Sequence, residues 1–85
     1  MAYQVTVMPA ADQAINKLPT QIRRRIADRL VMLAENPRGF GSVKLQGEDA
    51  YRVRVGDYRI IYAIHDQRLI VFVIDVGHRR DVYRR

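Results

Sequence analysis

The sequence contains no cysteine, which excludes disulfide bonds, thiolate catalysis and cysteine-held zinc. It also has no long apolar run, because the longest one, 69–74, is far short of the roughly 20 residues that a membrane-spanning helix needs. The first residues lack the charged and then apolar pattern of a secretory signal. We therefore expect a cytoplasmic protein that works in a reducing compartment and has no membrane partner.

Internal repeats, linkers and low-complexity tracts are absent as well. A chain of 85 residues fits a single domain, which we place at 1–85. Its 48% hydrophobic and 28% charged residues are typical of a folded soluble protein. A domain of this size buries only about 60–65% of the surface that its unfolded chain exposes, so we expect its stability to be marginal.

Acidic residues are few beside basic ones. The chain has 15 lysines and arginines against 9 aspartates and glutamates, a net charge of +6, and 13 of the basic residues are arginines. This charge favours a polyanionic partner, and a guanidinium can bind a phosphate through two hydrogen bonds at once. Charge alone leaves nucleic-acid binding and an ordinary solvated surface equally open.

Hydrophobic periodicity predicts two helices and four strands. The expected elements are a strand at 3–8, helices at 10–18 and 20–35, and strands at 50–55, 58–65 and 69–76. Gly56-Asp57 and Asp66-Gln67 are the expected hairpin turns. The order β-α-α-β-β-β predicts an α+β fold, a small two-layer sandwich in which two N-terminal helices pack on a mainly antiparallel sheet.

The longer helix has two faces. Helical spacing predicts a buried stripe made of Ile22, Ile26, Leu30 and Leu33. The basic residues of this helix lie mostly away from the stripe, and we interpret them as a solvated face rather than a direct RNA contact; they are Arg23, Arg24, Arg25 and Arg29.

The strands around the first hairpin turn carry an arginine cluster. A two-residue turn places Arg54 opposite Arg59 and Arg52 opposite Ile61, so the three arginines share the face that points away from the helices. Like charges directly opposite each other destabilise a sheet by about 0.2–1 kcal/mol. A bound phosphate would explain why a small domain tolerates this pairing.

Two alternatives concern this face. The arginines are instead paired within the molecule if a nearby carboxylate reaches them, and the candidates are Glu48, Asp49, Asp57 and Asp81. The same face carries an apolar strip that either the C-terminal segment or a partner protein must cover; it consists of Ile61, Ile70, Phe72 and Ile74.

Three motifs together resemble the RelE branch of the RelE/ParE toxins, over nearly the whole chain. They are Lys44-Leu45-Gln46-Gly47, the run at 51–62 that reads YRVRVGDYRIIY, and the run at 76–83 that reads VGHRRDVY. The family's β-α-α-β-β-β fold agrees with the predicted elements. At positions 52 and 54 this chain has arginines, whereas the family's best-known member has lysines there. The chain also ends soon after Tyr83, where the family often adds a helix.

The resemblance implies the toxin of a type II toxin–antitoxin system, an endoribonuclease that needs no metal or other cofactor. Such toxins cleave mRNA in the ribosomal A site by attack of the RNA's own 2′-hydroxyl, which inhibits translation. The implied partners are a cognate antitoxin, the ribosome and mRNA, with operator DNA bound only by the toxin–antitoxin complex.

The resemblance also implies roles for single residues. Arg52, Arg54 and Arg59 would stabilise the phosphate, Arg79 would act at the leaving group, and Tyr83 would be the general base. The residues expected to bind RNA are Lys44, Arg52, Arg54, His78 and Arg80.

The chemistry constrains two of these roles. Tyrosine has an ordinary pKa of about 10, so Tyr83 would need nearby guanidinium groups that favour the phenolate. Arginine is a poor proton donor, so we assign Arg79 mainly to charge stabilisation. His78 is either a proton donor or an ordinary turn residue.

Two other functions fit the same fold. A ParE-like toxin would bind DNA gyrase and cleave nothing itself, and a non-catalytic module would repress its own operator together with its antitoxin. The joint presence of Arg52, Arg54, Arg59, Arg79 and Tyr83 favours the ribonuclease.

Overall fold

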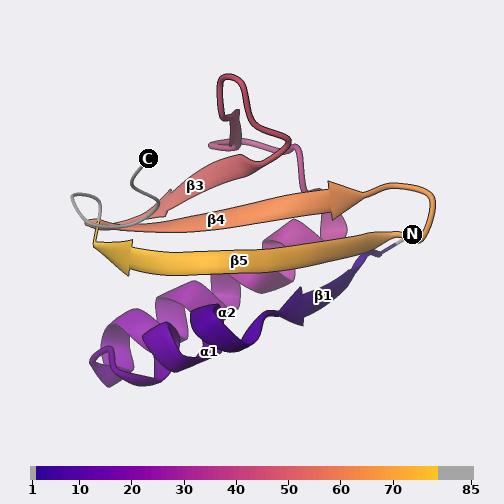
Figure 1. Cartoon of the computed structure of the whole chain (residues 1–85). Helices are drawn as coiled ribbons and strands as arrows, with labels where there is room; N and C mark the ends of the chain where they lie inside the picture. The colour runs from indigo at the N-terminus through magenta and orange to yellow at the C-terminus, as the bar shows by residue number, and fades with distance from the viewer. Residues whose placement is uncertain (1, 79–85) are drawn as a thin grey trace.

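The computed structural model describes residues 2–78, and in that range it contains two helices and five strands. In chain order they are β1 (Gln4–Val7), α1 (Pro9–Asn16), α2 (Thr20–Glu35), β2 (Val43–Lys44), β3 (Tyr51–Val55), β4 (Tyr58–His65) and β5 (Ile70–His78). The strands form one sheet in the order β1-β5-β4-β3-β2, in which β1 runs parallel to β5 and all other neighbours are antiparallel. Both helices lie on the same side of this sheet (Figure 1), which confirms the predicted two-layer α+β fold. The sequence did not predict the short strand β2.

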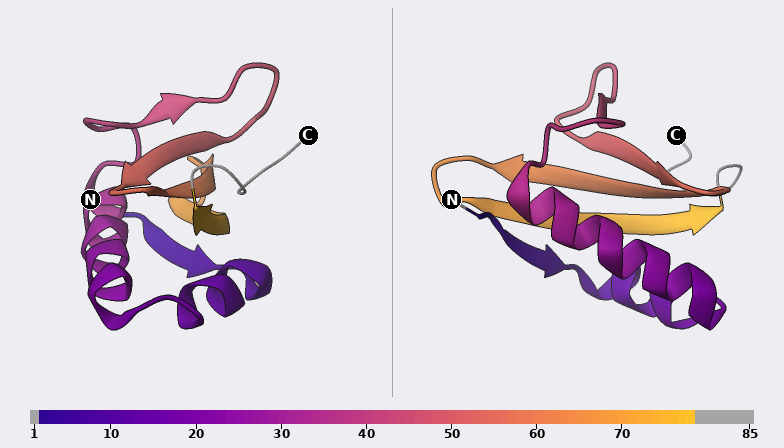
Figure 2. Two further views of the ribbon diagram at one scale, coloured as in Figure 1. Left: turned by 90° about the vertical axis from the view of Figure 1, so that its left-hand side faces the viewer. Right: turned by 180° about the vertical axis from the view of Figure 1, so that it is seen from behind.

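Proline sets both ends of α2. Pro19 directly precedes the helix. Asn36 ends it in an extended conformation, because Pro37 disfavours a helical backbone at the residue before it. The predicted stripe turns toward the sheet, with Ile26 and Leu33 buried. Figure 2 shows α2 running along the sheet as the longer of the two helices. Neither helix in the described range 2–78 is long and apolar enough to cross a membrane.

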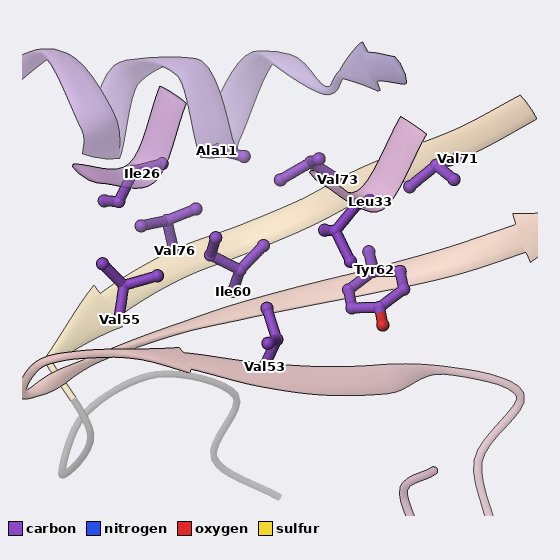
Figure 3. Packing of buried hydrophobic residues seen from close by; sticks show 10 residues of the cluster. All are labelled: Ala11, Ile26, Leu33, Val53, Val55, Ile60, Tyr62, Val71, Val73 and Val76. Carbon is purple, nitrogen blue, oxygen red and sulfur yellow. The ribbon is translucent and has the colours of Figure 1, made fainter. Parts of the chain in front are cut away.

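The core fills the space between the two layers (Figure 3). Because successive strand residues point to opposite faces, every second residue of β3 and β4 enters it, as the sequence predicts. The buried side chains of this cluster are Ala11, Ile26, Leu33, Val53, Val55, Ile60, Tyr62, Val71, Val73 and Val76.

The two hairpin turns differ in length. Gly56 has a φ of +59°, which glycine adopts without strain, and it forms the expected two-residue turn with Asp57. The second turn takes four residues, 66–69, rather than Asp66-Gln67 alone. Leu69 belongs to this turn with a φ of +56°, and its N–H donates to the Asp66 carbonyl at 3.2 Å. Strand β5 therefore begins later than predicted, at Ile70, and extends beyond Val76 to His78.

A buried tyrosine fixes the loop that follows α2. The Tyr62 hydroxyl donates to the Pro37 carbonyl at 2.6 Å and lies 2.8 Å from Ser42 Oγ. Tyr62 is fully buried, and burial raises the pKa of its hydroxyl. The loop between α2 and β2 is therefore attached to the sheet at two points.

An ion pair joins the same loop to the turn between β4 and β5. Arg38 donates from its two terminal nitrogens to the two carboxylate oxygens of Asp66, each at 2.9 Å. The Tyr3 hydroxyl donates to the same carboxylate at 2.8 Å. The hydrogen bonds from Arg38 and then Tyr3 lower the pKa of Asp66 to about 2. This end of the sheet is thus cross-linked by side chains from three segments.

Candidate functional site

The structure brings Arg52, Arg54 and Arg59 together, as predicted. Arg54 pairs with Arg59 across β3 and β4, and Arg52 pairs with Ile61, two residues along from Arg59. Partial burial, followed by repulsion from Arg54 and Arg59, lowers the pKa of Arg52. We call the side of the sheet that bears these three residues the arginine face. It lies opposite the side that packs on the helices, because the alternate residues Val53 and Ile60 are in the core.

Arg59 has a buried hydrogen-bond donor that is left without a partner in the described part of the chain. Its Nε atom is buried and has no hydrogen-bond partner among residues 2–78. Across the ladder it faces Gly77, which has no side chain that could accept a hydrogen bond. A buried donor without a partner costs about 1–3 kcal/mol, so an oxygen acceptor supplied by a ligand would be favourable here.

Among residues 2–78, no aspartate accounts for the cluster by an ion pair. The ion pair recorded among residues 2–78 joins Arg38 to Asp66, and Asp49 and Asp57 make none with the three arginines in that range. Lys44 Nζ donates to the main-chain carbonyl of Glu48 at 3.2 Å, a contact that does not involve the Glu48 carboxylate. Asp81, another candidate partner, lies outside the described residues.

A β-bulge adds a carboxylate that sequence reasoning missed. Simple alternation in 69–76 places Ile74 with Ile70 and Phe72 and points Asp75 toward the helices. In the structure the register shifts by one residue: Tyr62 pairs with Val73, Ile61 pairs with Asp75, and Ile74 is the extra residue. Asp75 therefore lies across from Ile61 on the arginine face, and its Oδ1 accepts a hydrogen bond from the Val76 N–H at 2.9 Å.

The expected apolar strip is covered in part by the chain itself. Ile61 is only 2% exposed and packs with Ala50 and Leu45, which belong to the segment between β2 and β3. The cover over Ile61 thus includes a segment that precedes β3 in the chain. Ile74 is exposed, whereas Phe72 is half-buried.

Two of the residues expected to bind RNA lie on the other side of the strands. Lys44 pairs with Tyr51, whose ring packs against the core, so the register places it on the opposite side from Arg52. His78 pairs with Tyr58, one residue out of phase with Arg59, and the two rings meet edge to face at 5.8 Å. The sheet register therefore does not bring Lys44 or His78 onto the arginine face. Arg79, Arg80 and Tyr83 lie outside the described residues.

The chain belongs to a family of toxins. The family model for the ParE toxin of the type II toxin–antitoxin system, parDE, matches residues 5–83. Since this match covers nearly the whole chain, it shows that the chain is a member of this family.

Within the family, the relatives found by sequence include several RelE proteins. The mRNA interferase toxin RelE of Escherichia coli (strain K12) is 34% identical over 82 residues, which cover 93% of this chain and 85% of that protein. Toxin RelG of Mycobacterium tuberculosis is 30% identical over the full length of both chains.

Solved structures give the same result. The toxin–antitoxin complex RelBE2 of M. tuberculosis contains a chain that matches with a TM-score of 0.84 and 27% identity, covering 95% of each chain. The isolated E. coli RelE toxin matches with a TM-score of 0.81 and 32% identity, covering 91% of this chain and 84% of that one. The resemblance stated from the sequence motifs is therefore confirmed by sequence and by fold.

Proposed function

We propose that this chain is the toxin of a type II toxin–antitoxin system and acts as a ribosome-dependent endoribonuclease. It cleaves mRNA in the ribosomal A site and so inhibits translation in the cytoplasm. The observation that carries this proposal is the arginine face, on which Arg52, Arg54 and Arg59 gather in a chain whose relatives include mRNA interferases.

The proposed reaction is an attack within the RNA. The 2′-oxygen loses its proton to a base, attacks the adjacent phosphorus and forms a 2′,3′-cyclic phosphate, while the bond to the 5′-oxygen breaks and that oxygen takes up a proton. Negative charge grows on the phosphate during this step, and guanidinium groups already held in place stabilise it without reorganisation. Arg59 and Arg52 are the partly buried members of the cluster, so their charge is the least screened by water.

The remaining roles are proposals from the resemblance. Tyr83 takes the proton from the 2′-hydroxyl, and Arg79 stabilises charge at the leaving 5′-oxygen. The other proposed RNA contacts are Arg54, Arg80, His78 and Lys44, of which the last two must approach the RNA around the edge or end of the sheet.

The proposed partners are the ribosome with its mRNA and a cognate antitoxin that holds the toxin inactive. The solved relatives include toxins in complex with RelB antitoxins from E. coli and Pyrococcus horikoshii. Operator DNA is bound only by the toxin–antitoxin complex. A net charge of +6 on the toxin favours an acidic antitoxin.

A test combines induced expression with mapping of mRNA ends. The wild-type chain should stop translation and produce breaks in phase with codons, whereas Arg59→Ala should lower the cleavage rate by about 100-fold, as loss of one charge-stabilising donor does. Tyr83→Phe should also relieve toxicity. Arg68→Ala, which changes an exposed arginine in the turn between β4 and β5, is the matched control and should cleave like wild type.

Gyrase poisoning is the second candidate, because the matching family model is that of ParE. Intact mRNA together with DNA damage after induction would favour gyrase and overturn the ribonuclease. Unchanged cleavage in both Arg59→Ala and Tyr83→Phe would overturn the residue assignments.

A further inference from the structure

Large apolar side chains gather on the surface where α2 ends. Phe40 is 97% exposed, Val31 66%, Met32 54% and Val43 43%, and only two other large apolar side chains among residues 2–78 are comparably exposed. We call these four residues the Phe40 surface. Scattered apolar residues are normal on proteins, but a contiguous exposed patch indicates an interaction site.

The Phe40 surface is concave. A cavity of about 330 Å³ lies between the end of α2 and the following loop, and its lining includes Val31, Met32, Leu33 and Phe40. A neighbouring cavity of about 420 Å³ shares Arg29 and Phe40 with the first and continues past Val43 and Val53 to Arg52 and Arg54. The two form one groove that leads from α2 to the outer edge of β3.

The loop that carries Phe40 is held in place by the rest of the protein. Arg29 Nη2 donates to the Phe40 carbonyl at 2.6 Å, and the Ser42 N–H donates to the Gly39 carbonyl at 3.1 Å. The Tyr62 hydroxyl fixes the same loop at Pro37. The backbone position that points Phe40 outward is therefore built into the fold, and a backbone already held in place lowers the entropy cost of binding.

Charge on the groove favours an acidic occupant. Arg29, Arg52 and Arg54 line the two cavities, and Glu35 is the acidic residue in their lining. An adjoining pocket that shares Arg29 and Arg54 adds Arg25 and Asp28, so the basic residues outnumber the acidic ones. The outer edge of β3 is also open, because β2 pairs only with Tyr51 and Arg52 and no other strand of residues 2–78 pairs there. An extended segment can bind to such an edge through its backbone.

We propose that this groove binds a segment of the cognate antitoxin that carries acidic residues around one or more apolar side chains. The proposal rests on the proposed function for the identity of the partner. The apolar lining of the first cavity offers few partners for the edges of RNA bases, and a second copy of this chain would bring two basic rims together. The apolar side chains enter the cavity beside Met32 and Phe40, and the acidic ones face Arg25 and Arg54.

The test measures binding of the purified antitoxin encoded beside this chain's gene. Phe40→Ser should weaken its affinity by about 30-fold, which corresponds to the loss of one central interface residue. Met32→Ser should weaken it in the same direction, and Arg25→Glu should slow association most strongly at low salt. Met8→Ser is the control, because Met8 is 39% exposed and lies at the start of α1, outside the groove; its affinity should stay within about two-fold of wild type. Thermal melting verifies that each variant is folded.

A second measurement separates this proposal from the proposed function. Phe40→Ser should inhibit cell-free translation as wild type does, yet resist neutralisation by the antitoxin. A wild-type chain that leaves translation intact overturns the proposed function, while the binding data still decide the surface. Equal antitoxin affinity for wild type and Phe40→Ser, or no antitoxin binding to wild type, overturns the proposal. So does an effect of Phe40→Ser confined to ribosome binding or to self-association, because RNA or a second copy would then be the occupant.

Discussion

Removing the charge of Arg54 should make the protein more stable and less active. Arg54 lies directly opposite Arg59, and like-charged cross-strand pairs cost about 0.2–1 kcal/mol. Coulomb's law gives a similar figure, about 0.7 kcal/mol for unit charges about 6 Å apart in water. Arg54→Gln should therefore raise the free energy of unfolding by about 0.5 kcal/mol. Arg54→Glu, which replaces repulsion by attraction, should raise it by about 1 kcal/mol.

The assay is urea unfolding and thermal unfolding of the three proteins at low salt and in 1 M NaCl. At low salt Arg54→Glu should be the most stable, Arg54→Gln the next and the wild type the least. Each kcal/mol should raise the melting temperature by roughly 4–8 °C for a domain of this size. In 1 M NaCl the differences should shrink, because the Debye length falls to about 3 Å. The rate of RNA cleavage should show the opposite order, highest for the wild type, lower for Arg54→Gln and lowest for Arg54→Glu.

A matched series at Arg68, an exposed arginine in the turn between β4 and β5, controls for the general effect of lowering the net charge. Equal gains in the two series would mean that the stabilisation comes from net charge and not from the pair. A loss of stability at position 54, or a gain that salt leaves unchanged, would refute the argument that the arginine face is electrostatically strained in the free protein.

Three further predictions follow from single contacts. Tyr62→Phe removes the hydrogen bond to the buried Pro37 carbonyl and should lower the free energy of unfolding by about 1–3 kcal/mol in urea titrations; a loss below about 0.5 kcal/mol would show that the carbonyl finds another partner. The pKa of Asp66 is lowered in the folded protein to about 2, so its contribution to stability is complete above its ordinary pKa near 4 and is lost as the pH falls toward 2. Asp66→Asn should therefore flatten the acid limb of the stability profile in that interval, and an unchanged limb would contradict the ion pair with Arg38. Asp75→Asn removes the carboxylate from the arginine face and should tighten binding of a short single-stranded RNA by about two-fold, since a unit charge about 8 Å away in water contributes about 0.5 kcal/mol; anisotropy titrations that show weaker binding would assign Asp75 a supporting role instead.

The relation between stability and activity in these predictions has a structural basis. The helix-facing side of the sheet holds the main apolar core, so it can stabilise the domain while the opposite side keeps charges that repel one another. Proteins commonly accept such a cost at a functional site. The expected gain in stability on removing Arg54 is thus a test of function as much as of folding.

The sequence by itself determined the layers, the helices and the pairing of β3 with β4. A two-residue turn at Gly56 allows one register, and strict alternation around it decides that Arg52, Arg54 and Arg59 share a face. These are local rules that involve residues close in the chain, and so they could be applied without coordinates.

Only the tertiary structure decided the features that depend on contacts between distant segments. The bulge at Ile74 moves Asp75 onto the arginine face, and it is a property of how β5 fits against β4 and the core, which alternation within one strand does not reveal. The side of the sheet on which Lys44 lies follows from its pairing with Tyr51, and that of His78 follows from its pairing with Tyr58. The exposure of Phe40 depends on a loop held by residues more than ten positions away in either direction, so only the folded chain shows it.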